Sequence, residues 1–241
     1  MSVLMTEIEN HVLTIRLNRP EKHNALNTAL TQALVDALRE GERNDQVRAI
    51  ILHGNGKSFC AGADTGEFSN LTPDAPDQVL DRADLTTSLH FAFSKIAKPI
   101  IAAVHGNALG GGAGLALACD LVVMAEDARF GYPELKHGIV AAVVLANLVR
   151  QLGQKKAFEL VAMAEPVSGE RAFELGLVNR VCASTEVLAQ ARDYAEKLAG
   201  WSPVAMATTK RTFYRAADLS LEEALAVGRD ANVMMRGFKK H

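Results

Sequence analysis

Residues 100–114, with the sequence IIAAVHGNALGGGAG, decide the fold of this chain of 241 residues. The apolar run at residues 100–104 has the length and composition of a strand that is buried on both faces. The glycines of residues 106–112 predict a tight loop, and the small residues 113–118 predict a short helix that follows it. A second buried strand is predicted at residues 121–125. A strand, a glycine-rich loop, a helix and a further strand in this order are typical of an α/β fold.

A second glycine-rich loop follows another short apolar strand. This strand is predicted at residues 49–53, and the loop from Gly54 to Gly66 contains four glycines. Glycine lets a ligand approach the backbone closely, and the N-terminus of a helix presents N–H groups that have no partner within the helix. One such loop is weak evidence for a site. Two in one chain indicate a pair of N–H donors directed at one oxygen atom, which is an oxyanion hole.

Two other uses of a glycine-rich loop do not fit the sequence. The dinucleotide-binding fingerprint requires glycine at its first, third and sixth positions. Counting from Gly110 places Leu115 at the sixth position, and counting from Gly112 places Leu117 there. A phosphate-binding P-loop requires Gly-Lys followed by Ser or Thr, and no such sequence follows these glycines. The pattern therefore predicts neither a dinucleotide site nor a P-loop.

The rest of the chain divides into an α/β part and a helical part. Residues 12–17 alternate as a strand does, and residues 28–42 and 77–95 have the pattern of helices. The last part of the chain is mostly helical. We expect an α/β core at residues 1–185 and a helical region, serving as a lid or an oligomerisation layer, at residues 186–241.

Composition and charge exclude several classes of protein. Lys and Arg together number 26 and Asp and Glu 28, so the formal net charge is −2, which gives no general attraction to nucleic acid or to anionic membranes. The unbroken apolar stretches of the chain are shorter than the length that a membrane-spanning helix requires. Cys60, Cys119 and Cys182 form neither a disulfide framework nor a zinc cluster. We therefore expect a cytoplasmic protein with no metal site and no nucleic-acid or membrane partner.

The order of short motifs along the chain resembles that of the crotonase family, the enoyl-CoA hydratases and isomerases. These motifs are residues 19–26 (RPEKHNAL), 58–64 (SFCAGAD), 98–104 (KPIIAAV), 106–112 (GNALGGG), 118–120 (ACD), 128–134 (ARFGYPE) and 172–179 (AFELGLVN). Each motif alone is weak, but together they cover nearly the whole chain in order and are highly specific.

This resemblance implies a fold, an assembly and a class of substrate. The fold is a crotonase-like spiral of ββα units with a helical C-terminal region. The assembly is a homotrimer, often paired into a hexamer. The substrate is an acyl-CoA thioester, and no cofactor is bound because coenzyme A enters as part of the substrate.

The resemblance also implies which residues bind the substrate. The backbone N–H groups of Ala63 and Gly111 would hold the thioester oxygen. Ala61, Ala63 and Asp64 would line the adenine pocket, largely through their backbone. Lys22 and His23 would lie near the ribose and the phosphates. An enolate forms when a proton leaves the carbon next to a thioester, and two N–H donors stabilise its oxygen.

The acid–base group decides the reaction. The resemblance places the second catalytic glutamate of the hydratases at Glu134, but the first falls at Gly114, which has no side chain. Residues 141–144 (AAVV) replace the glycine-rich stretch that normally follows the second glutamate. Two carboxylates hold a water molecule better than one does, whereas one carboxylate is enough to move a proton between two carbons. We therefore expect Glu134 to be the single acid/base and plain hydration to be slow.

Two alternative functions stay open at this point. Residues 133–138 (PELKHG) are similar to the corresponding stretch of the carboxymethylproline synthases, crotonase relatives that use one glutamate to form a C–C bond. The second alternative is a non-catalytic family member that binds acyl-CoA or serves as a scaffold. The glycine at position 114 favours that alternative, whereas Glu134 and both glycine-rich loops argue against it.

Overall fold

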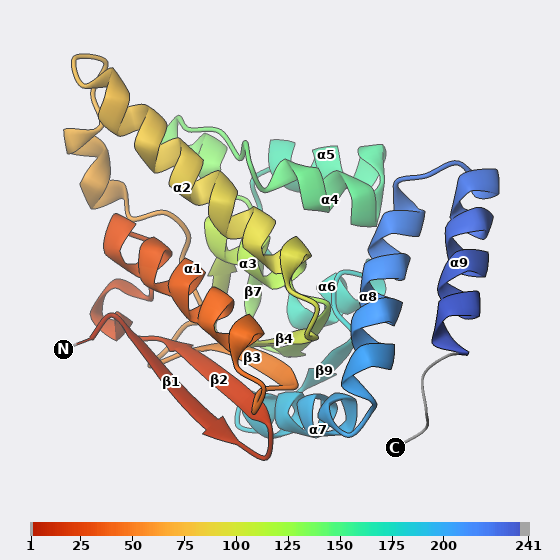
Figure 1. The fold of residues 1–241 in the computed structure, drawn as a ribbon. Helices are drawn as coiled ribbons and strands as arrows, with labels where there is room; N and C mark the ends of the chain where they lie inside the picture. The colour runs from red at the N-terminus through yellow and green to blue at the C-terminus, as the bar shows by residue number, and fades with distance from the viewer. Residues whose placement is uncertain (1, 237–241) are drawn as a thin grey trace.

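A central six-stranded sheet forms the base of the molecule (Figure 1). The computed structural model describes residues 2–236. In spatial order the strands are β1 (Leu4–Glu9), β2 (Val12–Leu17), β3 (Ala49–Gly54), β4 (Ile100–Val104), β6 (Leu121–Ala125) and β9 (Arg180–Cys182). Only β1 pairs antiparallel, and all the other neighbours in this sheet are parallel. Strand β4 is buried along its whole length, as its unbroken apolar sequence predicts.

A smaller, three-stranded sheet lies beside the central one. It consists of β5 (Asn107–Leu109), β7 (Arg129–Gly131) and β8 (Val167–Ser168). Strands of the two sheets alternate along the chain: β5 follows β4, β7 follows β6, and β9 comes after β8. A helix or a helical segment follows each of the first two pairs. This alternation is the spiral of ββα units that the sequence predicts.

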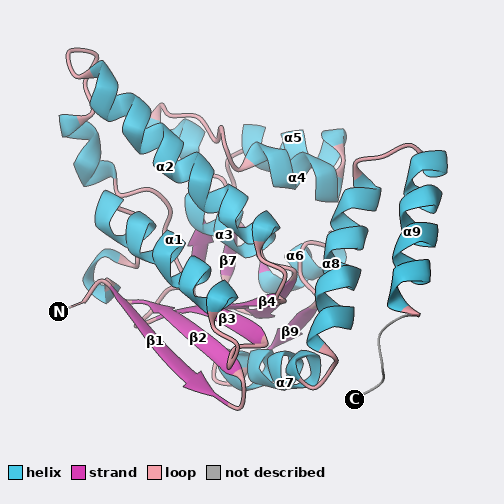
Figure 2. Cartoon of the chain, viewed as in Figure 1, coloured by secondary structure: helices cyan, strands magenta, loops and turns pink. Residues whose placement is uncertain are grey.

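Helices cover the sheets (Figure 2). The longer ones are α1 (Thr28–Arg43), α2 (Pro76–Lys95), α3 (Gly111–Ala118), α4 (Leu145–Leu152), α5 (Gln154–Ala162), α6 (Gly169–Glu174), α7 (Val187–Ala199), α8 (Pro203–Ala217) and α9 (Leu221–Met235). Three short 3₁₀ segments are η1 (Pro20–Lys22), η2 (Thr65–Asn70) and η3 (Glu134–His137). Helix α7 packs against β3, β4 and β6. Helices α8 and α9 pair with each other at the right of Figure 1, on the opposite side of the molecule from α1 and β1. No helix within residues 2–236 is long and apolar enough to cross a membrane.

Several elements differ from those predicted for the chain, and the short strands β7, β8 and β9 are not predicted at all. Strand β1 is not predicted, because nearly all of its side chains are exposed and it lies at the edge of the sheet. The predicted loop at residues 106–112 contains β5, which is too short to show a periodic pattern. Helix α3 begins at Gly111, two residues before its predicted start, because glycine at its first two positions disguises the helix in the sequence. The division at residue 185 stays a prediction.

A buried ion pair attaches α8 to the sheet. Lys210 Nζ lies 2.7 Å from Asp120 Oδ2, and only 7% of the Lys210 side chain is exposed. Asp120 also accepts hydrogen bonds from Ile100 N at 2.6 Å and from Tyr214 Oη at 2.7 Å. Lys210 donates a further bond to Lys98 O at 2.9 Å. Asp120 thus joins the start of β4 to α8, which supports a structural role for this residue.

Removing one member of this pair should destabilise the protein strongly. Lys210→Ala leaves the Asp120 carboxylate with little solvent and without its cation, so we expect the free energy of unfolding to fall by about 3 kcal/mol. Tyr214→Phe is the matched control, because it removes one hydrogen bond and should cost about 1 kcal/mol. Denaturant unfolding at fixed protein concentration measures both. A loss for Lys210→Ala no larger than that for Tyr214→Phe would contradict the structural role.

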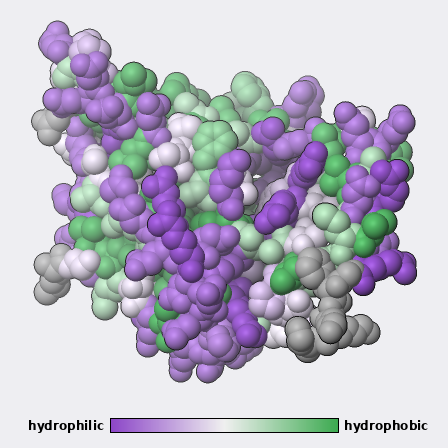
Figure 3. Space-filling model, in the orientation of Figure 1, coloured by the Kyte–Doolittle hydropathy of each residue, from purple (hydrophilic) through white to green (hydrophobic). Residues whose placement is uncertain are grey.

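Large apolar side chains on α8 and α9 predict self-association. Phe213 is 68% exposed, Leu221 78% and Leu225 65%. Figure 3 shows hydrophobic residues on the surface at the side where these helices lie. Exposed apolar groups of this kind mark contact surfaces between subunits. We expect a trimer or a hexamer by light scattering at micromolar concentration, and a monomer under those conditions would refute this prediction.

Candidate active site

The two glycine-rich loops lie against each other. Cys60 N donates to Asn107 O at 2.9 Å, and Leu109 N donates to Cys60 O at 3.0 Å, so the first loop pairs with β5. Glycine is required at the contact, because a Cβ on Gly112 would lie 2.1 Å from Cys60 O. Gly62, at φ +98°, is also closely packed, since a Cβ there would lie 2.7 Å from Leu109 O. Backbone contacts therefore hold the loops in one relative position.

This packing brings together the two predicted N–H donors. A Cβ on Gly111 would lie 3.7 Å from Ala63 N. Leu26 N donates to Gly62 O, and Asp64 N donates to Leu26 O, so the intervening Ala63 N–H points away from Leu26. Gly111 is the first residue of α3, where the N–H has no acceptor within the helix. Ala63 is exposed and Gly111 half-buried, so a ligand can reach both.

Glu134 lies at the same end of α3. Gly110 N donates to Gly131 O at 2.8 Å, which joins the helix N-terminus to the end of β7, three residues before Glu134. A Cβ on Gly110 would lie 2.8 Å from Glu134 Oε1. Gly110 has φ +53°, so both its conformation and its surroundings favour glycine. The structure thus places the predicted acid/base beside the predicted oxyanion hole.

The surroundings of Glu134 suit a general base. Burial raises the pKa of its carboxyl above the usual 4.5, and nearby His137 opposes this increase. Glu134 Oε2 is buried and has no hydrogen-bond partner among residues 2–236. A carboxylate with a raised pKa and a free lone pair accepts a proton more readily than an exposed one. The side chain of His137 is exposed.

The position of the missing glutamate is filled by neighbouring side chains. A Cβ on Gly114 would lie 2.2 Å from Val144 Cγ1 and 3.0 Å from His90 Cε1. Val144 belongs to residues 141–144, the stretch in which the expected glycines are absent. The absence of the first glutamate at position 114 and the absence of glycines at residues 141–144 therefore belong to one packing arrangement. A glutamate at position 114 would require Val144 to move.

The residues predicted to bind coenzyme A lie on one side of the first loop. Ala61 N donates to His23 O at 2.9 Å, so residues 22 and 23 lie next to this loop. Lys22 and His23 are exposed, and Lys22 ends the short helix η1. His23 adopts a left-handed conformation, with φ +49°, and its Nδ1 lies 3.1 Å from Ser58 Oγ. The structure thus brings Lys22 and His23 close to Ala61, Ala63 and Asp64.

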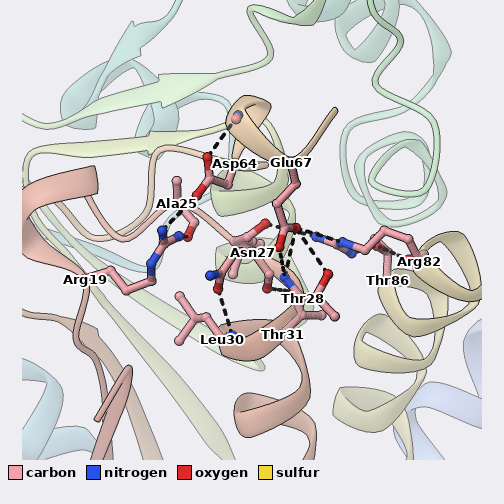
Figure 4. Close-up of polar contacts among 12 residues, drawn as sticks. Arg19, Ala25, Asn27, Thr28, Leu30, Thr31, Asp64, Glu67, Arg82 and Thr86 are labelled. Carbon is pink, nitrogen blue, oxygen red and sulfur yellow. Dashed lines mark hydrogen bonds and ion pairs between the residues drawn. The ribbon is translucent and has the colours of Figure 1, made fainter. Parts of the chain in front are cut away.

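The side chain of Asp64 stabilises the first loop. Arg19 Nη2 lies 2.8 Å from Asp64 Oδ2, and this guanidinium holds the pKa of the carboxyl below its usual range (Figure 4). Asp64 Oδ1 also accepts from Gly66 N at 3.0 Å and caps η2. A ligand near Asp64 therefore meets its backbone rather than a free carboxylate, in agreement with the predicted backbone role.

Sequence reasoning missed the residues that support these loops. Asn24 is fully buried, and its amide donates to Asn55 O at 2.9 Å and to Ser58 O at 2.7 Å. Glu67 accepts from Thr28 N at the start of α1 and lies 3.5 Å from Arg82 Nε of α2 (Figure 4). Asn24 falls within the motif at residues 19–26, which was the only signal for it. Glu67 and Arg82 carry no motif, since they meet only through the tertiary fold.

Comparisons with known proteins show which proteins this chain resembles. The family model for enoyl-CoA hydratase/isomerase matches residues 7–238. The 2,3-dehydroadipyl-CoA hydratase of Escherichia coli is 36% identical over 227 residues, which cover 94% of this chain and 87% of the relative. A Thermus thermophilus protein, provisionally named an enoyl-CoA hydratase, is 39% identical over 96% of this chain and 92% of its own length. The crystal structure of an enoyl-CoA hydratase from Mycobacterium smegmatis superposes with a TM-score of 0.93, at 32% identity, and covers 98% of this chain and 92% of that one.

The space around Gly111 generates a prediction about turnover. Gly111→Val would place side-chain atoms between Ala63 N and Leu26 Cδ1, which lie 3.7 Å and 3.3 Å from a Cβ at this position. We expect steady-state turnover of acyl-CoA to fall by about 10²-fold, the size of an oxyanion-donor loss. Gly200→Val is the control, because the nearest atom to a Cβ there lies at an ordinary 3.4 Å. Turnover like that of the wild type in folded Gly111→Val would remove this loop from the mechanism.

Proposed function

This chain belongs to the enoyl-CoA hydratase/isomerase family, and from that premise we propose that it moves a proton along an enoyl-CoA thioester with Glu134 as its only carboxylate acid/base. The protein is an acyl-CoA-processing enzyme of this family. The observation that carries the finer proposal is the position of Glu134 Oε1 against Gly110, the residue immediately before Gly111 at the N-terminus of α3.

The proposed reaction uses each of these groups. The N–H groups of Ala63 and Gly111 donate hydrogen bonds to the thioester oxygen, and these bonds strengthen as negative charge develops on it. Glu134 removes a proton from C2 of a 3-enoyl-CoA, and the electron pair of the C–H bond spreads over the dienolate. The same carboxyl returns the proton to C4, and a 2-enoyl-CoA results. Atoms and charge balance without a metal, a water molecule or a redox cofactor.

The coenzyme A part of the substrate would follow the first loop. We propose that the backbone of Ala61, Ala63 and Asp64 contacts the adenine. The exposed side chains of Lys22 and His23 would lie near the ribose and phosphates. The ammonium group of Lys22 is suited to a phosphate, because a cation and an anionic phosphate form charge-assisted hydrogen bonds. Backbone recognition agrees with the use of the Asp64 carboxylate in its ion pair with Arg19.

Hydration is the second candidate reaction, and the names of the relatives favour it. A protein 36% identical to this chain is a 2,3-dehydroadipyl-CoA hydratase. Against efficient hydration stands the packing of Val144 over Gly114, which leaves Glu134 without a second carboxylate to help hold a water molecule. The C–C bond-forming alternative also needs a single glutamate, but no observation of the structure favours it over proton transfer. The position of Glu134 against Gly110, beside the first residue of α3, argues against a purely non-catalytic role.

Substitution of Glu134 tests the proposed chemistry. We expect Glu134→Gln to abolish turnover because the amide cannot accept the proton, while acyl-CoA binding stays nearly intact because backbone groups form the oxyanion hole. In the wild type, 3-enoyl to 2-enoyl isomerisation should be faster than hydration of crotonyl-CoA. Absorbance assays of both reactions and calorimetric binding of butyryl-CoA measure these quantities. Hydration faster than isomerisation would show that a single carboxylate suffices here and would overturn the isomerase assignment.

A further inference from the structure

His90 contributes a polar group close to the proposed site that the mechanism above leaves unused. It lies on α2, which packs against α3 (Figure 1). His90 Cε1 would lie 3.0 Å from a Cβ on Gly114. Gly114 N donates to Gly110 O, so the two glycines are just over one helical turn apart, about 6 Å along the axis of α3. Glu134 approaches Gly110, and His90 approaches Gly114, so both side chains lie along the first turn of this helix.

The imidazole of His90 is neutral in the folded protein. Burial lowers its pKa to about 4. A neutral imidazole has one nitrogen that donates and one that accepts. His90 Nδ1 is buried without a hydrogen-bond partner among residues 2–236. An N–H in this position would be a buried donor with no acceptor, so the proton belongs on Nε2.

Several side chains near His90 are apolar. Val144 meets the same face of α3, and Leu89 and Phe93 of α2 are buried. The ring therefore adds hydrogen-bonding capacity beside Val144, which offers none. A polar group in a mostly apolar pocket determines which substrate fits, because substrate atoms left unpaired there are costly.

We propose that His90 Nε2–H donates a hydrogen bond to an oxygen on C3 of the acyl chain, either the hydroxyl of a 3-hydroxyacyl-CoA or the water that adds to C3 of a 2-enoyl-CoA. This inference rests on the proposed function, since it takes the thioester oxygen to be held at Gly111. C3 is two bonds from the thioester carbon, so an oxygen on C3 falls within about one helical turn of that site. His90 thus recognises 3-oxygenated acyl groups and is the group that holds water for the slow hydration.

The ring nitrogens suggest a matched set of variants. His90→Gln places its terminal amide where Nε2 of histidine lies and keeps an N–H donor there. His90→Asn places its amide near Nδ1 and cannot reach as far. His90→Leu removes all hydrogen bonding and keeps an apolar side chain. The series therefore separates loss of the donor from loss of packing.

Calorimetric titration of butyryl-CoA and 3-hydroxybutyryl-CoA tests the proposal. All proteins also carry Glu134→Gln, which prevents turnover of the hydroxyacyl ligand. We expect His90→Leu and His90→Asn to lower the affinity for 3-hydroxybutyryl-CoA by about threefold to tenfold, the value of one hydrogen bond. His90→Gln should retain that affinity, and butyryl-CoA should bind all four proteins within about twofold. Circular dichroism confirms that each protein is folded.

A kinetic measurement with Glu134 intact gives an independent readout. His90→Leu should lower kcat for hydration of crotonyl-CoA by about threefold to tenfold, the equivalent of the same hydrogen bond, and leave isomerisation nearly unchanged. Equal losses for both ligands, or equal losses in both reactions, would show a packing role and overturn the proposal. Undetectable hydration combined with no preference for the 3-hydroxyl would also overturn it. If no acyl-CoA binds to any of the proteins, the proposed function itself fails, and the inference fails with it.

Discussion

The close contact between two backbone segments is the constraint on which the site depends. Gly112 against Cys60 O and Gly62 against Leu109 O leave no room for a side chain, so the two loops pack backbone to backbone. That contact holds the backbone of Gly111 and Ala63 in one relative position, and the side chains of Asn24 and Asp64 further support the first loop. The oxyanion hole proposed for these two groups would be organised before substrate binds, and this preorganisation is what makes such N–H donors effective. The layered sheets around it supply the rigidity.

The sequence predicts the parts of the fold whose pattern is local. The buried strands β3 and β4 and the helices α1 and α2 follow from apolar periodicity, and their bounds agree with the structure to within about two residues. Strand β1 escapes prediction because an exposed edge strand has no apolar alternation, and β5 because it is only three residues long. The helical hairpin of α8 and α9 is predicted as helix, but its attachment through Lys210 and Asp120 is not, since 90 residues separate the two.

The residues of the candidate site likewise fall into two groups, those that the sequence predicts and those that only the tertiary structure reveals. Ala63, Gly111 and Glu134 follow from motifs, and the structure brings them together around the N-terminus of α3. His90 has no motif and stands in an ordinary helical stretch, so only the packing of α2 on α3 reveals its place. The raised pKa of Glu134 is likewise a product of tertiary burial. Sequence patterns thus identify groups that act through the backbone or through a short motif. They do not identify a side chain, such as that of His90, which lies near the site only because a helix distant in the sequence packs there.

The contact between Val144 and Gly114 links the loss of a carboxylate to the loss of a glycine-rich stretch. A Cβ at position 114 would lie only 2.2 Å from Val144 Cγ1, so any residue larger than glycine requires the side chain of Val144 to move. Conversely, a smaller residue at position 144 alone would leave an apolar cavity beside His90, at a cost that grows with the volume of the cavity. Neither change is favourable without the other. A second glutamate at position 114 therefore requires two substitutions together, one at Gly114 and one at Val144, because either substitution alone destabilises the protein.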